Sequence, residues 1–280
     1  MPQPAKAITV EPLNPVVGAE VHGLSLAEEL TAEGIAAVQA ALNAHGVIFF
    51  RDQEITPEQQ LAFGRRFGEL HVHPSVRGKP RSEWSELLPV HADASTQRVV
   101  GDKWHTDVSC DEKPPYASIL HMTVVPPSGG DTLFSSMYAA YEALSEPMKR
   151  VLEPLTATHD GAPNYADRAR RNRETSSDRV DPRAVHPVIA THPKTGRKTI
   201  YVNSVFTTRI NELTEAESRA VLELLFAHVM RPEFQCRFHW RQNSVAFWDN
   251  RAVQHYAVWD YYPHVRSGLR VTIRGDRPHA

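Results

Sequence analysis

The sequence predicts a mainly β protein whose core is a double-sheet jelly roll with helices packed outside it. Three observations favour this class: many short strand-like segments, few segments with apolar residues at helical spacing, and two long polar stretches. The 280 residues also include 21 prolines, which favour turns and interrupt long helices. A chain of this length suits one large domain, and we expect a single domain over 1–280.

The N-terminal part of the chain is expected to be α/β. Short strands are predicted at 8–10 and 16–17. Residues 31–45 carry apolar side chains at helical spacing and are followed by Gly46, which indicates a helix and its end. The apolar run 47–50 that comes next predicts a buried strand.

A second helix is predicted to begin after Thr56. The run Thr56-Pro57-Glu58-Gln59 is a capping box with proline at the first helical position, and the helix should end near Gly68. The segment that follows, about 71–103, is polar, contains several prolines and shows no periodicity. Long loops in compact domains are usually functional, so we interpret this one as a mobile lid or pocket wall.

The remainder is expected to be rich in strands. Residues 234–240 alternate apolar and polar side chains, which is typical of a half-buried strand. A further capping box, Thr214-Glu215-Ala216-Glu217, predicts a helix through about His228. The other predicted elements are, in chain order, a strand at 118–125, a turn at 128–131, a short helix at 137–144, a second mobile loop at about 161–183, and strands at 198–203, 245–248 and 269–273.

Composition narrows the classes of partner. The formal charge of −2 argues against nucleic acid, and no apolar run approaches the length of roughly 18 residues that a membrane span needs. The first residues lack the apolar core of a signal peptide. Cys110 and Cys236 are too few for a disulfide framework and are expected to be reduced and packed. We therefore expect a cytoplasmic protein, and we also expect a homo-oligomer, either a dimer or a tetramer.

Several histidine pairs have the spacing of metal ligands. On a strand, residues two apart point to the same side, so His105 and Asp107 could face one ion. With 15 histidines in the chain such pairs also arise by chance, as in His91-Ala92-Asp93 and His71-Val72-His73. From spacing alone a surface or structural histidine is the default, and each pair is only a hypothesis.

Context favours the pair at His105 and Asp107. It opens the strand-rich region, whereas the other two pairs lie in the polar loop. His255 follows a predicted strand end, where a side chain can project from a rigid edge. Two imidazoles and one carboxylate suit an iron(II) site that keeps positions open for substrate and oxygen. Arg266 could then bind the far carboxylate of a keto acid, and Arg270 would share its face of a strand.

At these residues the chain resembles the taurine dioxygenase family of iron(II)- and 2-oxoglutarate-dependent oxygenases. The resemblance covers nearly the whole chain, and its motifs occur in one order. They are Phe50-Arg51-Asp52-Gln53, Arg66-Phe67-Gly68-Glu69-Leu70-His71-Val72-His73-Pro74, Trp104-His105-Thr106-Asp107-Val108, Gly129-Gly130-Asp131-Thr132-Leu133, Ala139-Ala140-Tyr141-Glu142-Ala143-Leu144, Phe206-Thr207-Thr208-Arg209, Trp248-Asp249-Asn250-Arg251 and Gln254-His255-Tyr256.

The resemblance implies a double-stranded β-helix fold and a role for each matching residue. His105, Asp107 and His255 would ligate iron(II). Arg266 and Thr132 would bind the distal carboxylate of 2-oxoglutarate, which a guanidinium can grip with two hydrogen bonds. Arg270 would face the anionic head of the prime substrate, and His73, Val108 and Phe206 would line its pocket. The implied reaction consumes oxygen and 2-oxoglutarate, hydroxylates a substrate carbon and releases succinate and carbon dioxide.

Three positions depart from the taurine-specific pattern. Val76 and Gly161 stand where those enzymes have aromatic residues, and Gly101 stands where they have an asparagine. Loss of the amide removes a partner for the taurine amine, and a site built to pair a polar group discriminates strongly. We predict an enlarged pocket and a bulkier or longer anionic substrate than taurine. A sulfonate or sulfate ester is favoured, and an aryloxyalkanoate is the alternative.

Two alternatives come from other classes of protein. A zinc hydrolase could use the same ligands with a metal-bound water as nucleophile, but it leaves Arg266 and Arg270 unexplained. A non-catalytic β-sandwich binding module would leave the His–Asp pair without a purpose. Dependence of turnover on iron(II), oxygen and oxoglutarate together would distinguish the oxygenase from both.

Overall fold

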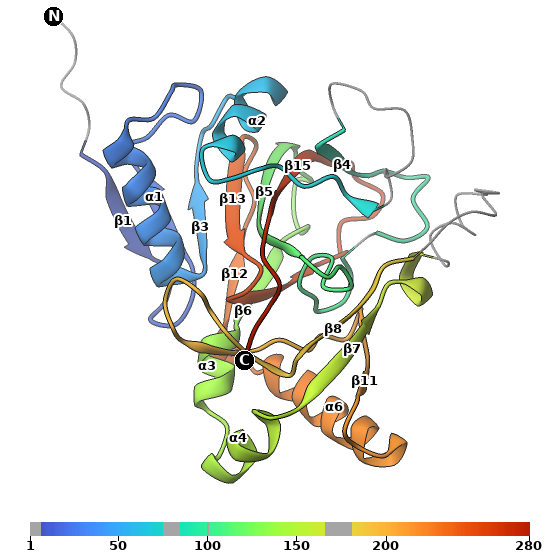
Figure 1. Ribbon diagram of the computed structural model, residues 1–280. Helices are drawn as coiled ribbons and strands as arrows, with labels where there is room; N and C mark the ends of the chain where they lie inside the picture. The colour runs from blue at the N-terminus through green and yellow to red at the C-terminus, as the bar shows by residue number, and fades with distance from the viewer. Residues whose placement is uncertain (1–6, 75–84, 100, 166–180) are drawn as a thin grey trace, which may run out of the picture.

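The computed structural model describes residues 7–74, 85–99, 101–165 and 181–280. Two sheets face each other at its centre, which confirms the predicted jelly-roll class (Figure 1). The larger sheet has the strand order β1-β2-β3-β13-β5-β15-β4. In that order the strands span Thr9–Pro12, Ala19–His22, Val47–Phe50, Ser244–Asp249, Pro115–Val124, Arg266–Arg274 and Leu87–Ala92.

The smaller sheet that faces it has the order β12-β6-β14. These strands span Gln235–Phe238, Thr132–Ser136 and Val253–Ala257. Both of its pairings are antiparallel, and β14 places His255 opposite Phe134 of β6. A third sheet, with the order β11-β7-β8, is formed by Thr207–Ile210, Thr156–Asp160 and Arg183–Pro187, and a short pair joins β9 (Ile189–Thr191) to β10 (Lys198–Ile200).

Strand β3 shows why the larger sheet lies in the centre of the molecule. All four of its residues are fully buried, because both faces of the sheet are covered. Ile48 and Phe50 pack into the cluster under helices α1 (Ala32–His45) and α2 (Pro57–Arg65). Val47 and Phe49 belong to the cluster between the two sheets, where Phe49 stacks on Phe238 at 3.8 Å. This interior holds the facing sheets in place and lies directly beneath the site described below.

A third cluster packs the lower helices of Figure 1 against the short strands. It involves α3 (Met137–Glu142), α4 (Glu146–Leu152), α6 (Glu215–Val229) and the 3-10 turn η2 (Pro232–Phe234). The predicted capping boxes are present at both helix starts: Thr56 caps α2 and Thr214 caps α6, each through reciprocal bonds with the residue three further on. Helix α1 ends at Gly46, whose φ of 71° suits glycine.

Some predicted elements are wrong. The segment 71–103 is not a loop throughout, because residues 87–92 form the edge strand β4, which pairs with β15. The sequence analysis missed this strand because it contains Pro89, and proline argues against a strand. Proline is tolerated mainly at the edge of a sheet, which is where β4 lies. Residues 16–17 are not a strand, and the pairing begins at Ala19. Residues 75–84, 100 and 166–180, on which much of the two loop predictions falls, lie outside the described residues.

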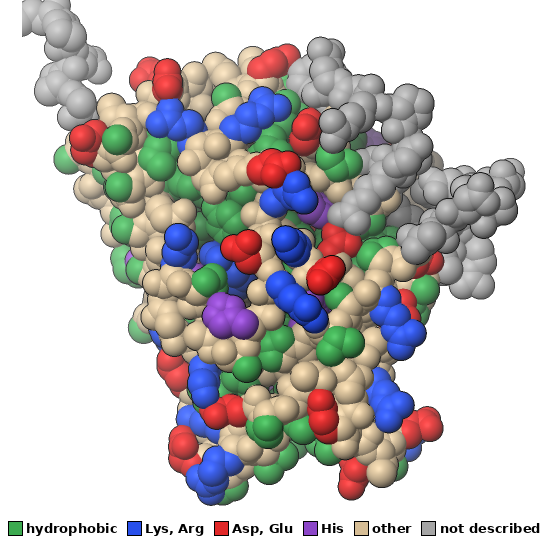
Figure 2. All heavy atoms as spheres, in the orientation of Figure 1, with side chains coloured by type: hydrophobic (Ala, Val, Ile, Leu, Met, Phe, Trp, Pro, Cys, Tyr) green, Lys and Arg blue, Asp and Glu red, His purple; other side chains and the backbone are tan. Residues whose placement is uncertain are grey.

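The surface is mixed in charge. Figure 2 shows acidic and basic side chains interspersed over one face, which agrees with the near-balance of 31 Lys and Arg against 33 Asp and Glu. Cys110 and Cys236 are both buried and form no disulfide, as predicted. Among the described residues, no helix is both long and apolar enough to cross a membrane.

Candidate metal centre

The fold brings His105, Asp107 and His255 together. Their candidate ligand atoms all lie within 4.8 Å of one another, and all three residues are buried. Reciprocal backbone hydrogen bonds of 3.1 and 2.8 Å join His105 to His255 and hold the two imidazole rings 4.1 Å apart. Segments half the chain apart are thus fixed side by side by backbone pairing before any metal binds.

The side chains of His105 and Asp107 point to the same side, but the cause is not the strand that the sequence analysis expected. They do not lie on a regular strand, because His105 forms an isolated bridge and Asp107 begins a turn. Between them, Thr106 turns the other way and donates its hydroxyl proton to the carbonyl of Asn250. The turn continues through Val108, whose φ of 49° is in the left-handed region. Such strain in a β-branched residue is tolerated where surrounding structure imposes it.

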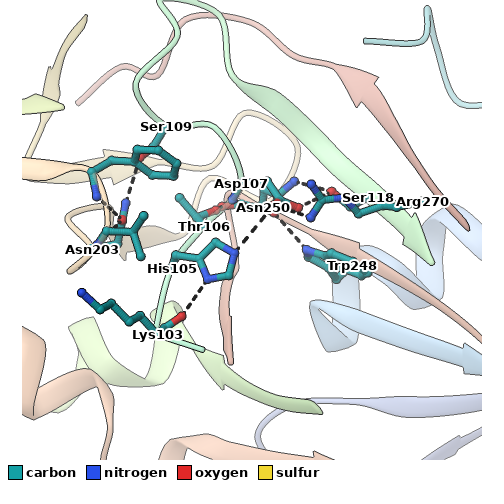
Figure 3. Close-up of polar contacts among 12 residues, drawn as sticks. Lys103, His105, Thr106, Asp107, Ser109, Ser118, Asn203, Trp248, Asn250 and Arg270 are labelled. Carbon is teal, nitrogen blue, oxygen red and sulfur yellow. Dashed lines mark hydrogen bonds and ion pairs between the residues drawn. The ribbon is translucent and has the colours of Figure 1, made fainter. Parts of the chain in front are cut away.

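Both imidazoles are prepared to act as neutral ligands. The Nδ1–H of His105 donates to the carbonyl of Lys103 at 2.8 Å, which leaves the Nε2 lone pair facing Oδ1 of Asp107 at 3.8 Å (Figure 3). Burial lowers the pKa of His105, and it lowers the pKa of His255 further with help from the neighbouring ring. Nδ1 of His255 is a buried nitrogen without a hydrogen-bond partner.

Asp107 is held as an anion. Burial by itself would raise its pKa, but Arg270, the two histidines and the Ser118 hydroxyl outweigh burial and keep the pKa below its usual value. Ser118 donates to Oδ2 at 2.7 Å and Arg270 donates to Oδ1 at 2.8 Å. Two neutral imidazoles and one carboxylate match the donor set of an iron(II) facial triad. No fourth His, Cys, Asp or Glu joins the group within the described part of the chain, so the residues fit a metal with open positions.

A cavity of about 280 Å³ lies on one side of the triad, between the two sheets. Arg266 reaches into it from β15, is only 4% exposed, and forms no ion pair within the described ranges. Its guanidinium donates to the carbonyl of Gly130 at 3.0 Å and to Thr132 Oγ1 at 3.4 Å. A buried cation without an anion is costly, so this cavity is suited to a ligand that brings a carboxylate.

A second cavity of about 490 Å³ lies on the other side of the triad. All four residues that the sequence assigned to the prime substrate line it: His73, Val108, Phe206 and Arg270. Arg270 and His105 also line the first cavity, so the two spaces meet at the triad. Arg270 was expected to face a substrate, and here it contacts Asp107 while its buried Nε has no partner.

Two side chains near these cavities were missed by the sequence analysis. Trp240 lies with its ring 5.6 Å from the guanidinium of Arg266 and donates its indole N–H to Thr132 Oγ1 at 2.9 Å. The alternation of apolar and polar side chains over residues 234–240 pointed Trp240 inward and could have identified it. Tyr165 lines the second cavity, in a cluster with Val108 and Phe206, and no periodicity in its polar surroundings signalled it.

The prediction that Gly161 leaves the pocket open is wrong. A Cβ atom at Gly161 would lie 2.8 Å from the ring of Tyr165, so the absence of a side chain makes room for this tyrosine. The Tyr165 ring also lies 6.1 Å from that of His73, edge to face, and the hydroxyl lies 3.9 Å from the Cys110 thiol. An aromatic wall is therefore present, supplied from four residues further along the chain. Val76, the other aromatic loss, lies outside the described residues.

Among the described residues, the competing histidine pairs form no metal site. His91 contacts Asp93 at 3.4 Å with both side chains well exposed. His71 is buried, but its partners are Asp111 at 3.1 Å and Thr272 at 3.3 Å rather than His73. Neither pair gathers a third ligand within the described part of the chain.

Comparison with known proteins places this geometry in a family. The model of the taurine catabolism dioxygenase TauD, TfdA family matches residues 9–272. An alpha-ketoglutarate-dependent sulfate ester dioxygenase of Pseudomonas putida is 37% identical, over 98% of this chain and 92% of that protein. Alpha-ketoglutarate is another name for 2-oxoglutarate.

Solved structures agree with the sequence relatives. A taurine dioxygenase from Burkholderia xenovorans superposes with a TM-score of 0.83 at 36% identity, covering 98% of this chain and 93% of that one. The enzyme AAD-2, solved with Mn(II) and N-oxalylglycine, superposes with a TM-score of 0.82 at 29% identity, covering 98% and 100%. The chain therefore belongs to the TauD/TfdA family and is a dioxygenase that depends on iron(II), 2-oxoglutarate and dioxygen.

Proposed function

We propose that this enzyme hydroxylates the carbon next to the heteroatom of a small organic anion, with a sulfate ester or sulfonate as the favoured substrate. The hydroxylated product would break down to a carbonyl compound and the released anion. One observation carries the proposal: two cavities, each reached by an arginine of β15, meet at a buried group of two histidines and one aspartate.

In this proposal His105, Asp107 and His255 hold iron(II). Arg266 and Thr132 bind the distal carboxylate of 2-oxoglutarate at the end of the first cavity, where the guanidinium forms no ion pair with a described residue. Trp240 supports both residues, because it packs on one and donates to the other. When bound, the metal and the keto acid activate dioxygen, and the keto acid is oxidised to succinate and carbon dioxide.

Arg270 is proposed to bind the anionic head of the prime substrate. It reaches the second cavity from β15, and its buried Nε is a donor without a partner. His73 and the backbone at Val108 would line the head region, while Phe206 and Tyr165 enclose the rest of the substrate. Exclusion of water from this space and correct placement of the carbon are the tasks of these side chains.

The similarity to a sulfate ester dioxygenase supports a sulfate or sulfonate head. An aryloxyalkanoate is the second candidate, because the rings of Phe206 and Tyr165 lie 6.2 Å apart in the same cavity and could pack on an aryl group. Taurine is disfavoured, since Gly101 offers no side chain to its amine.

The proposal is tested by measuring succinate with a panel of alkyl sulfates, alkanesulfonates, taurine and aryloxyacetates. We expect succinate formation that requires iron(II), oxygen and 2-oxoglutarate together and is stimulated most by a sulfate ester or sulfonate other than taurine. His105→Ala should abolish it while retaining the native circular dichroism spectrum. Taurine as the best substrate by kcat/KM would contradict the substrate class, and product formation without oxygen would favour a zinc hydrolase.

The two arginines should have separable roles. Arg266→Ala should raise the KM for 2-oxoglutarate by about 10- to 100-fold, the value of a charged hydrogen-bonded contact, with a smaller effect on the prime substrate. Arg270→Ala should show the opposite preference. Steady-state kinetics with each substrate varied in turn measures both, and equal effects from the two variants would show that the assignments are wrong.

A further inference from the structure

The motif Trp248-Asp249-Asn250-Arg251 has a part that lies directly behind the candidate metal centre. The carboxamide of Asn250 is buried between β5 and the turn that carries Asp107 (Figure 3). Its Oδ1 lies 3.0 Å from Nε1 of Trp248 and 3.3 Å from the backbone nitrogen of Asp107. Its Nδ2 lies 3.0 Å from the hydroxyl of Ser118.

The orientation of this carboxamide is dictated by its neighbours. An indole N–H and a backbone N–H can only donate, so the atom of Asn250 that faces both must be the acceptor oxygen. The amide nitrogen must then face Ser118. The backbone of Asn250 is fixed as well, because its N–H donates to Tyr116 at 2.7 Å and its carbonyl accepts from Thr106.

The orientation of the Asn250 carboxamide also fixes the direction of the hydrogen bond between Ser118 and Asp107. The Ser118 side chain is fully buried, and its oxygen accepts a hydrogen bond from the side-chain amide of Asn250. Its own proton is therefore directed to Oδ2 of Asp107, at 2.7 Å. Oδ1 is the oxygen that faces Nε2 of His105 at 3.8 Å, and it also accepts a hydrogen bond from Arg270 at 2.8 Å. The two oxygens of one carboxylate thus have different surroundings: Oδ1 lies toward the triad and Arg270, and Oδ2 lies toward Ser118 and Asn250.

We infer that Ser118 and Asn250 are positioning residues that keep Oδ2 of Asp107 away from the metal, so that only Oδ1 serves as a ligand. This inference rests on the metal site of the proposed function. A carboxylate that bound through both oxygens would fill one of the positions that a facial triad leaves open for cosubstrates. Hydrogen-bonded partners of a ligand orient it in this way in other metal sites.

The test uses Mn(II) and the full chain. Water bound directly to Mn(II) speeds the magnetic relaxation of bulk water protons in proportion to the number of bound waters. Wild-type protein with one Mn(II) should show the relaxivity of a site with open positions. Ser118→Ala frees Oδ2 to bind, and we expect about a third of the inner-sphere relaxivity to be lost, since one of three open positions is filled.

Two further variants make the result specific. In Asn250→Asp the group that faces Ser118 becomes an acceptor, so the serine proton is shared and the relaxivity should fall in the same direction. Ser135→Ala is the matched control, because Ser135 is equally buried but donates to the carbonyl of Val229, in another part of the core. Its relaxivity should equal that of the wild type.

The outcomes distinguish the positioning role of Ser118 and Asn250 from the metal site on which it rests. Relaxivity of Ser118→Ala equal to that of Ser135→Ala would overturn the inference and leave the metal site standing. Failure of the wild type to bind one Mn(II) per chain, measured by titration calorimetry, would overturn the metal site itself and the inference with it. Loss confined to Ser118→Ala and Asn250→Asp would establish both.

Discussion

At the scale of single residues, the second cavity shows how one glycine makes room for an aromatic ring four residues further along the chain. Gly161 and Tyr165 form one turn, in which the nitrogen of Tyr165 donates to the carbonyl of Gly161 at 2.9 Å. Burial raises the pKa of the Tyr165 hydroxyl well above its usual value, so it stays protonated beside Cys110. The ring therefore acts as an uncharged wall whose position depends on the missing side chain at residue 161.

This pair gives the first residue-scale prediction. Tyr165→Ala should extend the cavity and raise the preference for long over short linear alkyl sulfates, as a ratio of kcat/KM values, by about tenfold. Gly161→Ala should shift this ratio of kcat/KM values in the same direction, because the new methyl group displaces the ring of Tyr165. Tyr165→Phe keeps the ring and serves as the control. An unchanged chain-length profile in Tyr165→Ala would show that the ring does not limit the substrate.

At the scale of elements, the turn that bears Asp107 rests on a buried histidine pair. His159 of β7 lies 2.9 Å from the hydroxyl of Ser109, and Nε2 of His186 of β8 donates to the carbonyl of Asp111 at 2.9 Å. The two rings are 5.2 Å apart. Burial lowers both pKa values, and for His159 the neighbouring His186 lowers it further.

The pair predicts a specific loss of stability in acid. Below the ordinary histidine pKa of 6.5 the unfolded chain binds protons that the folded pair excludes, so the free energy of unfolding should fall as the pH is lowered from there. His186→Gln retains a donor for Asp111 and should make this decline shallower by up to about 1.4 kcal/mol per pH unit. Urea unfolding at a series of pH values measures it.

A control for this prediction is His264→Gln, which changes an exposed histidine outside β7 and β8. The free energy of unfolding of this variant should fall in acid as steeply as that of the wild type. Identical slopes for His186→Gln and the wild type would mean that the pair does not exclude protons in the folded state.

Sequence reasoning succeeded for elements whose signal is local. The capping boxes at Thr56 and Thr214 and the apolar run of β3 need no knowledge of the rest of the chain. Strand β4 was missed because its burial comes from pairing with β15, about 180 positions away, and its own pattern is broken by Pro89. Long-range pairing of this kind leaves little trace in the segment itself.

The site shows the same division. The residue types and spacing of His105 and Asp107 raised the possibility of a metal, and the family resemblance selected them from other pairs. Sequence spacing could not identify Tyr165 or Ser118 as residues of the site. Neither position carries a pattern, and each matters only because the fold places it beside other site residues. The cause of the shared orientation of His105 and Asp107, a turn rather than a strand, was also beyond local reasoning.

At the scale of the whole molecule, the candidate metal centre joins β14 of the smaller sheet to the segment of His105 and Asp107, and Ser118 and Arg270 of the larger sheet contact Asp107. Its occupation should therefore stabilise the fold as a unit. At a free concentration one hundred times the dissociation constant, iron(II) under anaerobic conditions should add about 2.7 kcal/mol to the free energy of unfolding. Differential scanning calorimetry with and without a chelator measures the change.

Two variants define this effect. His105→Ala should lose the response to metal, and Arg266→Ala should keep it but lose the further stabilisation that 2-oxoglutarate adds to the loaded wild type. A metal response that persists in His105→Ala would place the stabilising ion elsewhere. Cytoplasmic location and a dimeric or tetrameric assembly stay predictions from the sequence.

The two arginines that reach the cavities belong to one continuous strand, β15, and lie four positions apart. At the rise of an extended chain that spacing amounts to roughly 13 Å, and neighbours on both sides of the strand fix it. The backbone of β15 thus fixes the spacing of the two side chains that reach the two cavities. If the two arginines bind the two anions as proposed, a difference in substrate length has to be met by the cavity wall opposite β15 and not by this strand.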